Sequence, residues 1–88
     1  MTCYIVSFDL LEPLRNHDQL YASVKAYADW AKLNGSTWAL VTEDSVLQIR
    51  DQLKQHLEVN DRLFIVKSGV EAAWRNPECE NEWLKENL

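Results

Sequence analysis

The chain has 88 residues, enough for one small domain, because a chain of this length buries only about 60 % of its unfolded surface and cannot divide that core. With 47 % hydrophobic and 26 % charged residues, two glycines and two prolines, the composition excludes disordered, collagen-like and low-complexity proteins. No hydrophobic run reaches the ~18 residues of a membrane span, and residues 1–9 lack the basic start of a signal peptide. We therefore expect a soluble, cytoplasmic protein that does not bind membranes.

The chain carries nine basic and 14 acidic residues, a net charge of −5, and the acidic excess is greatest near its end. Residues 70–88 hold two basic and five acidic residues, whereas residues 1–69 hold seven and nine. Nucleic-acid binders usually carry a stripe of Lys and Arg, because contacts to phosphates supply most of their non-specific affinity. The basic residues here are scattered among acidic ones, so the charge does not support a nucleic-acid partner.

Residues 3–10 predict a β-strand, and a helix is predicted to follow it. Apolar residues occupy one side of the strand (Tyr4, Val6, Phe8 and Leu10) and a mixed set occupies the other (Cys3, Ile5, Ser7 and Asp9). Beyond Pro13, Asn16 can cap a helix that begins near His17. The apolar stripe of this helix consists of Leu20, Val24, Tyr27 and Ala31.

The end of this helix has two interpretations. Asn34-Gly35 is a strong hairpin signal, because both central residues of a type I′ turn need positive φ. That interpretation ends the helix near Ala28 and makes residues 30–33 a strand. The alternative carries the helix to Leu33 and uses Gly35 as its left-handed terminator. We favour the hairpin.

The remaining elements complete the pattern. Residues 36–42 are apolar and β-rich, typical of a central strand, and residues 62–67 predict the last strand. Between them, Ser45 and Gln48 predict a capping box for an amphipathic helix whose apolar positions are Val46, Ile49, Leu53 and Leu57. Asn76-Pro77-Glu78 predicts the start of a short C-terminal helix.

The order β-α-β-β-α-β predicts an α+β protein, a ferredoxin-like sandwich with a short C-terminal helix. We expect residues 1–69 to form the ferredoxin-like domain and residues 70–88 to form an acidic tail that contains the helix. A domain this small with exposed sheet edges also favours self-association, so we expect a two-fold homodimer.

Asp9 is the candidate catalytic and metal-binding residue. It ends the first strand, which is central in the usual arrangement of this topology, so a partly desolvated carboxylate is expected that can bind Mg²⁺ or act as a base. The alternative is an exposed strand-end Asp that caps the following turn. One carboxylate per chain is too few for a dedicated Mg²⁺ site, so catalysis would need the second protomer or substrate phosphates.

Other residues give little sign of chemistry. His17 and His56 lie on different predicted helices without metal-ligand spacing, and Cys3 and Cys79 lie outside any CxxC motif, so we expect free thiols and no cofactor. Trp74, Arg75 and Trp83 follow the last predicted strand. Because aromatic residues and Arg dominate interfaces, we expect them to cover a neighbouring protomer or another protein, with packing on their own sheet as the alternative.

Three segments resemble a known family: SFDL at 7–10, LYASVKAYADWAKLNGSTWALVT at 20–42 and QIRDQLKQHLEVNDRLFIVK at 48–67. They resemble the small bacterial SinR-family proteins, which are similar in turn to the CRISPR-associated Cas-two and VapD-like proteins. The resemblance implies a ferredoxin-like dimer formed through its sheets. It implies either metal-dependent nucleic-acid cleavage or a structural role bridging an integrase, and it maps the metal-binding aspartate to Asp9 and a polar position to Ser36.

The chain also departs from this family. Cas-two members tend to follow the aspartate with basic residues, whereas here Glu12 and Pro13 precede the first Arg15. With the acidic balance, this favours a catalytically silent interaction or scaffold protein. The alternative is a weak Mg²⁺-dependent nuclease, acting on RNA or DNA, that uses Asp9 from both protomers.

Overall fold

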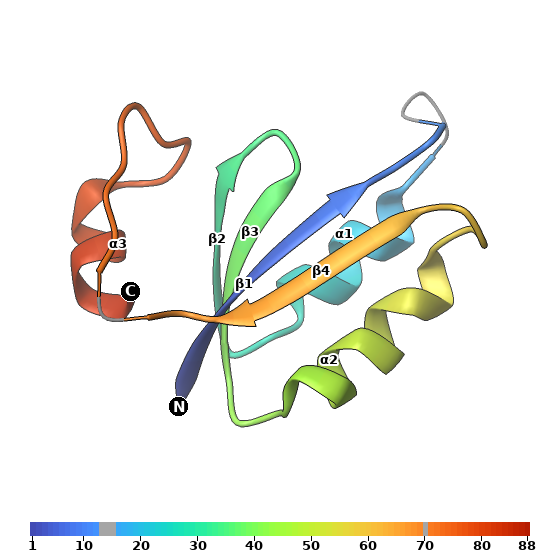
Figure 1. The fold of residues 1–88 in the computed structure, drawn as a ribbon, viewed down its shortest axis with the longest axis horizontal. Coiled ribbons are helices and arrows are strands. Elements are labelled where there is room, and N and C mark those ends of the chain that lie inside the picture. Colours follow the sequence, from blue (N-terminus) through green and yellow to red (C-terminus); the bar gives the residue numbers. More distant parts are fainter. Residues whose placement is uncertain (13–15, 70) are drawn as a thin grey trace.

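A sheet of four antiparallel strands organises the chain (Figure 1). The computed structural model describes residues 1–12, 16–69 and 71–88. The strands are β1 (Thr2–Asp9), β2 (Asp29–Asn34), β3 (Thr37–Thr42) and β4 (Arg62–Lys67), in the order β2-β3-β1-β4. The helices are α1 (Asp18–Lys25), α2 (Val46–Leu53), which a 3₁₀ turn continues over Lys54–His56, and α3 (Asn81–Asn87). The predicted element order is therefore confirmed, and β1 is an inner strand.

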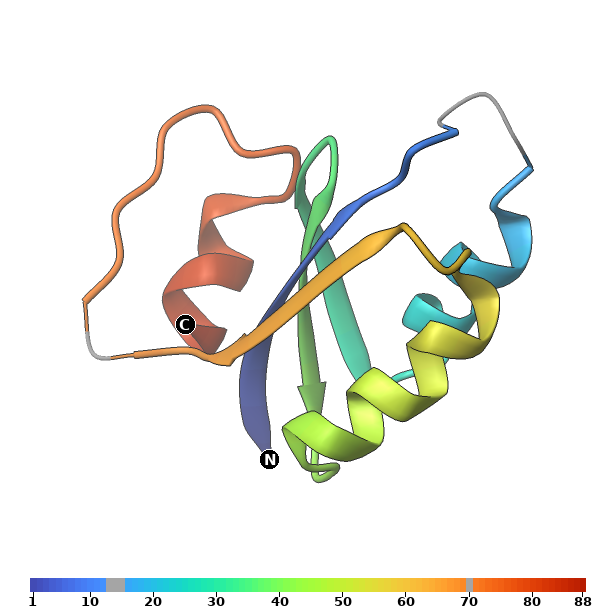
Figure 2. The same cartoon turned by 45° about the vertical axis from the view of Figure 1, so that its right-hand side comes forward.

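Helices α1 and α2 cover one face of the sheet, and the hydrophobic core lies beneath them (Figure 2). The alternation predicted for β1 is confirmed, because Val6 and Phe8 are buried on this face. The pairing of β1 with β3 sets Val6 opposite Trp38, which places the large indole in the same layer. The buried core consists of Val6, Phe8, Leu20, Val24, Trp38, Leu40, Ile49 and Leu53. No helix among the described residues is long and apolar enough to cross a membrane.

Strands β2 and β3 form the favoured hairpin, and the alternative that carried the first helix to Leu33 is wrong. The predicted type I′ turn is also wrong. Gly35 and Ser36 connect the strands, and Asn76 is the one described residue with a φ between +20° and +160°. A register shift between Lys32 and Asn34 changes the strand geometry next to the turn, so the hairpin closes without positive φ.

The capping box of α2 is present as predicted. The Gln48 backbone N–H donates to Ser45 Oγ at 3.2 Å, and the Ser45 N–H donates to Gln48 Oε1 at 2.8 Å. The helix ends at Leu53, earlier than predicted, because the chain tightens into the 3₁₀ turn. Leu57 therefore lies beyond the helix, although it still packs against the core.

Helix α3 begins at Asn81, so the predicted start at Asn76-Pro77 is wrong. Asn76 has φ of 53°, a left-handed conformation that Asn tolerates in turns but that differs from the extended backbone of a helix N-cap. Glu80 has that extended conformation instead. The helix lies on the opposite side of the sheet from α1 and α2 (Figure 2), and its Leu84 is 2 % exposed.

The C-terminal segment packs on its own sheet. The Trp83 indole N–H donates to Asp29 Oδ2 at 3.2 Å, and the Glu78 N–H donates to the Leu33 carbonyl on the outer edge of β2 at 3.0 Å. The radius of gyration, 12.7 Å, is near the ~12 Å expected for a compact chain of this length. In the structure of the single chain this segment therefore packs on its own sheet, which was the alternative to covering a neighbouring protein.

A matched pair of Leu→Ala substitutions on α2 tests the assignment of its buried face. Leu53 is fully buried and Leu47 is 57 % exposed. We expect Leu53→Ala to lower the free energy of unfolding by about 2–5 kcal/mol, since it leaves a cavity in the core. Leu47→Ala should change it by less than about 0.5 kcal/mol. Urea titrations measure both, and equal losses would show that the helix buries another face.

Candidate functional site

Asp9 lies at the exposed end of β1. Its side chain is 61 % exposed, and its Oδ2 accepts a hydrogen bond from Arg62 Nη1 at 3.1 Å, from the directly opposite residue of β4. The expected partial desolvation is therefore wrong, because none of the described helices covers the face that carries Asp9 at this end of the strand. Among the described residues of the following turn, the Leu11 N–H donates to Asp61 Oδ1, at 3.0 Å, and not to Asp9.

The structure brings together the two positions that the family resemblance selected. Asp9 and Ser36 line one cavity of about 330 Å³, which Ser7, Phe8, Leu10, Tyr21 and Gly35 complete. The Phe8 N–H donates to the Ser36 carbonyl at 3.1 Å and holds the hairpin against β1. The residues that line the cavity thus carry one carboxylate and three hydroxyls. The described part of the chain contains no cluster of three or more His, Cys, Asp or Glu suited to a metal ion.

The second face of the sheet is only partly covered. Ile5, Phe64 and Val66 share this face with Asp9, because β1 and β4 pair Ile5 with Val66 and Ser7 with Phe64. Phe64 is 66 % exposed, Val66 is 40 % exposed and Ile5 is half-buried. We call these three side chains the apolar strip. Two of its three members, Phe64 and Val66, lie on edge strand β4, where the strip is most exposed.

The tail residues predicted to form an interface have internal contacts. The Trp74 indole N–H donates to Asn81 Oδ1 at 3.1 Å, and that of Trp83 bonds to Asp29. Trp74 and the exposed Arg75 line a hollow of about 290 Å³ between the tail and the β2–β3 hairpin. Both indole N–H groups are thus satisfied within the chain. Contact of these residues with a second chain stays a prediction.

The two histidines, which were predicted on different helices without metal-ligand spacing, line a common cavity of about 400 Å³. His17 is 7 % exposed, and its Nε2 lies 2.8 Å from the Glu12 carbonyl, so this nitrogen donates the hydrogen bond. His17 thereby ties the chain before α1 to the helix. His56 reaches the cavity from the 3₁₀ turn after α2. Two imidazoles give fewer ligands than a structural metal site needs.

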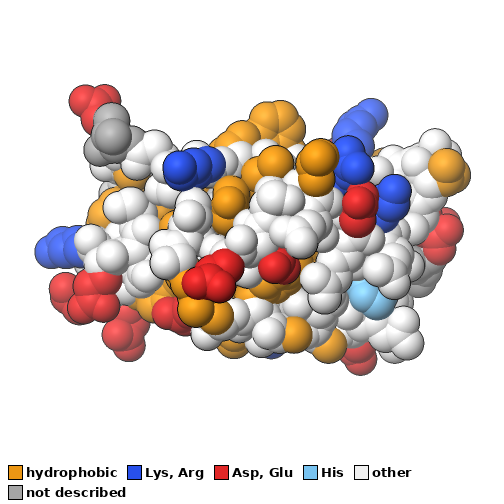
Figure 3. All heavy atoms as spheres, turned by 90° about the horizontal axis from the view of Figure 1, so that it is seen from below, with side chains coloured by type: hydrophobic (Ala, Val, Ile, Leu, Met, Phe, Trp, Pro, Cys, Tyr) orange, Lys and Arg blue, Asp and Glu red, His pale blue; other side chains and the backbone are white. Residues whose placement is uncertain are grey.

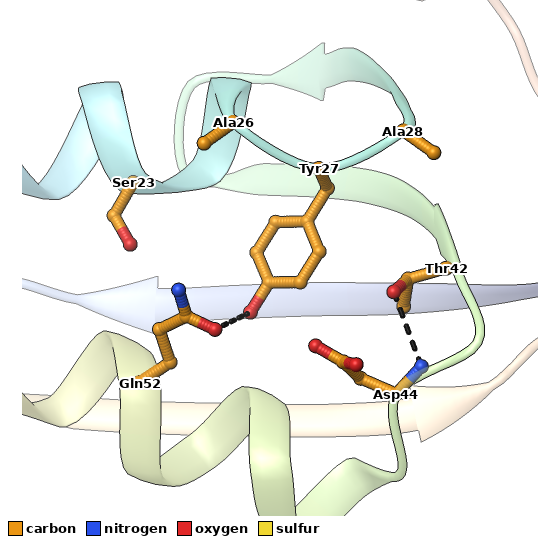
Figure 4. A pocket seen from close by; sticks show the side chains of 7 residues that line it. All are labelled: Ser23, Ala26, Tyr27, Ala28, Thr42, Asp44 and Gln52. Atoms are coloured by element: carbon orange, nitrogen blue, oxygen red, sulfur yellow. Dashed lines mark hydrogen bonds between the residues drawn. The ribbon is translucent and has the colours of Figure 1, made fainter.

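A polar pocket of about 210 Å³ was not predicted from the sequence (Figure 4). It lies where the end of α1, the end of β3 and α2 meet, and it is lined by Ser23, Ala26, Tyr27, Ala28, Thr42, Asp44 and Gln52. Burial raises the pKa of the Tyr27 hydroxyl, and the Asp44 carboxylate raises it further. The only sequence signal was the polar character of residues 42–45 between two regular elements.

Comparisons of the chain with protein-family models, with curated proteins and with solved structures gave no match. The function is therefore argued from the residues and their geometry.

The reactivity of Cys3 tests whether α3 covers the second face. Cys3 is 8 % exposed. It lies directly opposite Val41 of β3, which in turn lies opposite Asp29 of β2, and Asp29 accepts the hydrogen bond from Trp83 of α3. Burial raises the pKa of the Cys3 thiol, and Asp29 raises it further, which keeps the thiol protonated and unreactive.

In a Cys79→Ser background, which leaves Cys3 as the only thiol, we expect slow reaction with a chromogenic aromatic disulfide. Leu84→Ala weakens the docking of α3 and should accelerate the reaction by roughly tenfold or more. Lys85→Ala, on the exposed side of α3, is the control and should leave the rate unchanged. Equal rates in all three proteins would mean that α3 does not protect Cys3.

Proposed function

We propose that this chain is a non-catalytic interaction module of ferredoxin-like fold that forms a two-fold homodimer through the apolar strip. The strand order β2-β3-β1-β4, with a helix linking β1 to β2 and another linking β3 to β4, supports the fold assignment. The exposure of Phe64 on edge strand β4 is the observation that supports a role in protein interaction. An exposed apolar row on an edge strand is a surface that proteins normally cover.

The size of the strip sets the expected strength of the dimer. Full burial of a Phe or Val side chain contributes about 1.5–3 kcal/mol, and a two-fold interface buries each side chain twice. Counted in both copies, Phe64 and Val66 contribute at most about 6–12 kcal/mol, which exceeds the lower estimates of the cost of association, about 4 kcal/mol, by about 2–8 kcal/mol. We therefore expect a weak dimer that forms at micromolar or higher concentrations of the protein.

Charges beside the strip suit a symmetric interface. Asp9 and Arg62 lie on the same face, at one end of the strip, and carry opposite charges. In a two-fold arrangement the Asp9 of one copy can approach the Arg62 of the other, so the patch is complementary to itself. Figure 3 shows hydrophobic side chains gathered near the middle of the molecule, with basic side chains on both sides of them; acidic side chains are most numerous at the end occupied by α3 and also lie in the middle and at the opposite end.

The homodimer is tested with two substitutions of opposite expectation. Phe64→Glu places charge in the strip, whereas Val59→Glu places it at a residue that is 95 % exposed, in the turn before β4. Sedimentation equilibrium should find wild-type protein and Val59→Glu as dimers at high concentration, and Phe64→Glu as a monomer. A wild-type protein that stays monomeric, or a Phe64→Glu variant that still dimerises, would refute the proposed interface.

The second candidate is a weak Mg²⁺-dependent nuclease, and the cavity shared by Asp9 and Ser36 is the observation in its favour. The proposed dimer has Asp9 on its contact face, so two carboxylates can come together. Against this candidate, Arg62 already pairs with Asp9, and a single chain supplies no further carboxylate to the cavity.

Incubation with single-stranded RNA and double-stranded DNA in Mg²⁺ separates the two candidates. We expect no cleavage by the wild-type protein or by Asp9→Asn. Because the Asp9–Arg62 pair is exposed, the substitution should cost less than about 1 kcal/mol of stability, so any lost activity would not reflect unfolding. Cleavage by the wild-type protein that disappears in Asp9→Asn would establish the nuclease and overturn the non-catalytic proposal.

A further inference from the structure

The polar pocket at the end of α1 has no part in the proposed dimer, and its charge is unbalanced. Asp44 is the only acidic residue among the residues that line the pocket, and no Lys, Arg or His lines it. In the described part of the chain, the salt bridges within 4.0 Å join other residues, so no basic group pairs with the Asp44 carboxylate. A half-buried carboxylate without a counter-ion favours a cationic ligand.

The end of α1 adds to this negative potential. The helix ends at Lys25, and its last carbonyls lie beside the pocket, where the helix dipole is negative. The Lys25 side chain in the last turn is directed to two aromatic rings: its Nζ lies 5.3 Å from the ring centre of Trp30 and 6.0 Å from that of Trp38. The ammonium group is thus held over aromatic rings that do not line the pocket.

The remaining polar groups supply acceptors around the same space. Figure 4 shows the Tyr27 hydroxyl, the Gln52 amide and the Asp44 carboxylate close together; they come from the turn after α1, from α2 and from the loop between β3 and α2. The Tyr27 hydroxyl donates to Gln52 Oε1 at 3.3 Å, which leaves the phenolic oxygen available as an acceptor. Thr42 Oγ1 accepts from the Asp44 N–H at 3.1 Å and fixes the backbone that carries the carboxylate.

We propose that this pocket binds an alkylammonium group, with Asp44 as its counter-ion and the oxygens of Tyr27 and Ser23 as further acceptors. An ammonium group has three donors and no acceptor, which matches a carboxylate surrounded by hydroxyls. The volume of about 210 Å³ is below the ~300–1,000 Å³ of pockets that hold drug-sized ligands, so nucleotides and large cofactors do not fit. The ammonium can come from a free aliphatic amine or from a lysine side chain of another protein.

The first experiment is a titration of the ¹⁵N-labelled protein with n-butylammonium, followed by the amide shifts of Tyr27 and Asp44. n-Butanol is the neutral ligand of the same shape. We expect saturable shifts with butylammonium at millimolar concentrations, as befits a ligand of a few heavy atoms, and none with butanol. Nα-acetyl-lysine methylamide tests the second source, because its ammonium is carried on a peptide unit.

Two carboxylate substitutions test the role of Asp44. Asp44→Asn should weaken butylammonium binding by roughly tenfold or more, since it removes a charge-assisted bond. Asp51→Asn is the control: this exposed carboxylate on α2 pairs with Arg50 and Lys54 and does not line the pocket. It should leave binding unchanged, and the amide spectra of both variants report whether the fold is intact.

Each outcome decides the proposal. Binding of butylammonium together with the lysine analogue supports a pocket open to protein side chains, and binding of butylammonium alone supports a free amine as ligand. The proposal is overturned if neither cation binds, if butanol binds equally well, or if Asp44→Asn binds as tightly as the wild-type protein. None of these results depends on whether the protein dimerises.

Discussion

The alternation of side chains along β1 is the constraint on which the rest of the structure depends. Because successive residues of a strand point to opposite faces, burial of Val6 and Phe8 under α1 and α2 sends Cys3, Ile5 and Asp9 to the other face. Among the described helices, only α3 lies on that face. Its seven residues give a helix about 10 Å long, shorter than the ~14 Å across four strands. Part of the second face is therefore left open.

The two edges of the sheet differ for the same reason. At β2, the tail bonds to the Leu33 carbonyl through the Glu78 N–H, and α3 packs with Leu84 buried. At β4, the described residues provide no such cover, and Phe64 extends into solvent. The candidate functional features follow this division: the apolar strip and Asp9 lie on the open half, whereas the polar pocket lies on the other side, at the ends of α1 and β3.

Sequence patterns predicted the parts of the fold that local physics determines. The alternation in β1 and the Ser45–Gln48 capping box are set by residues close together in the chain, and both are present. Two predictions were wrong: the type of the turn after Asn34 and the start of α3. A register shift changed the backbone next to the turn, and a left-handed Asn76 changed it before α3. Residue preferences determine neither change. The exposure of Asp9 and the pocket around Asp44 depend on the placement of distant elements, which no local pattern contains.

The most direct test of the central claim is an isotope-filtered nuclear Overhauser experiment on an equal mixture of labelled and unlabelled wild-type protein. It detects contacts between copies only. The account predicts intermolecular contacts from the Phe64 ring to the methyl groups of Val66 and Ile5. Their absence at the highest attainable concentration, or intermolecular contacts confined to the side of the molecule that carries α1 and α2, would contradict it.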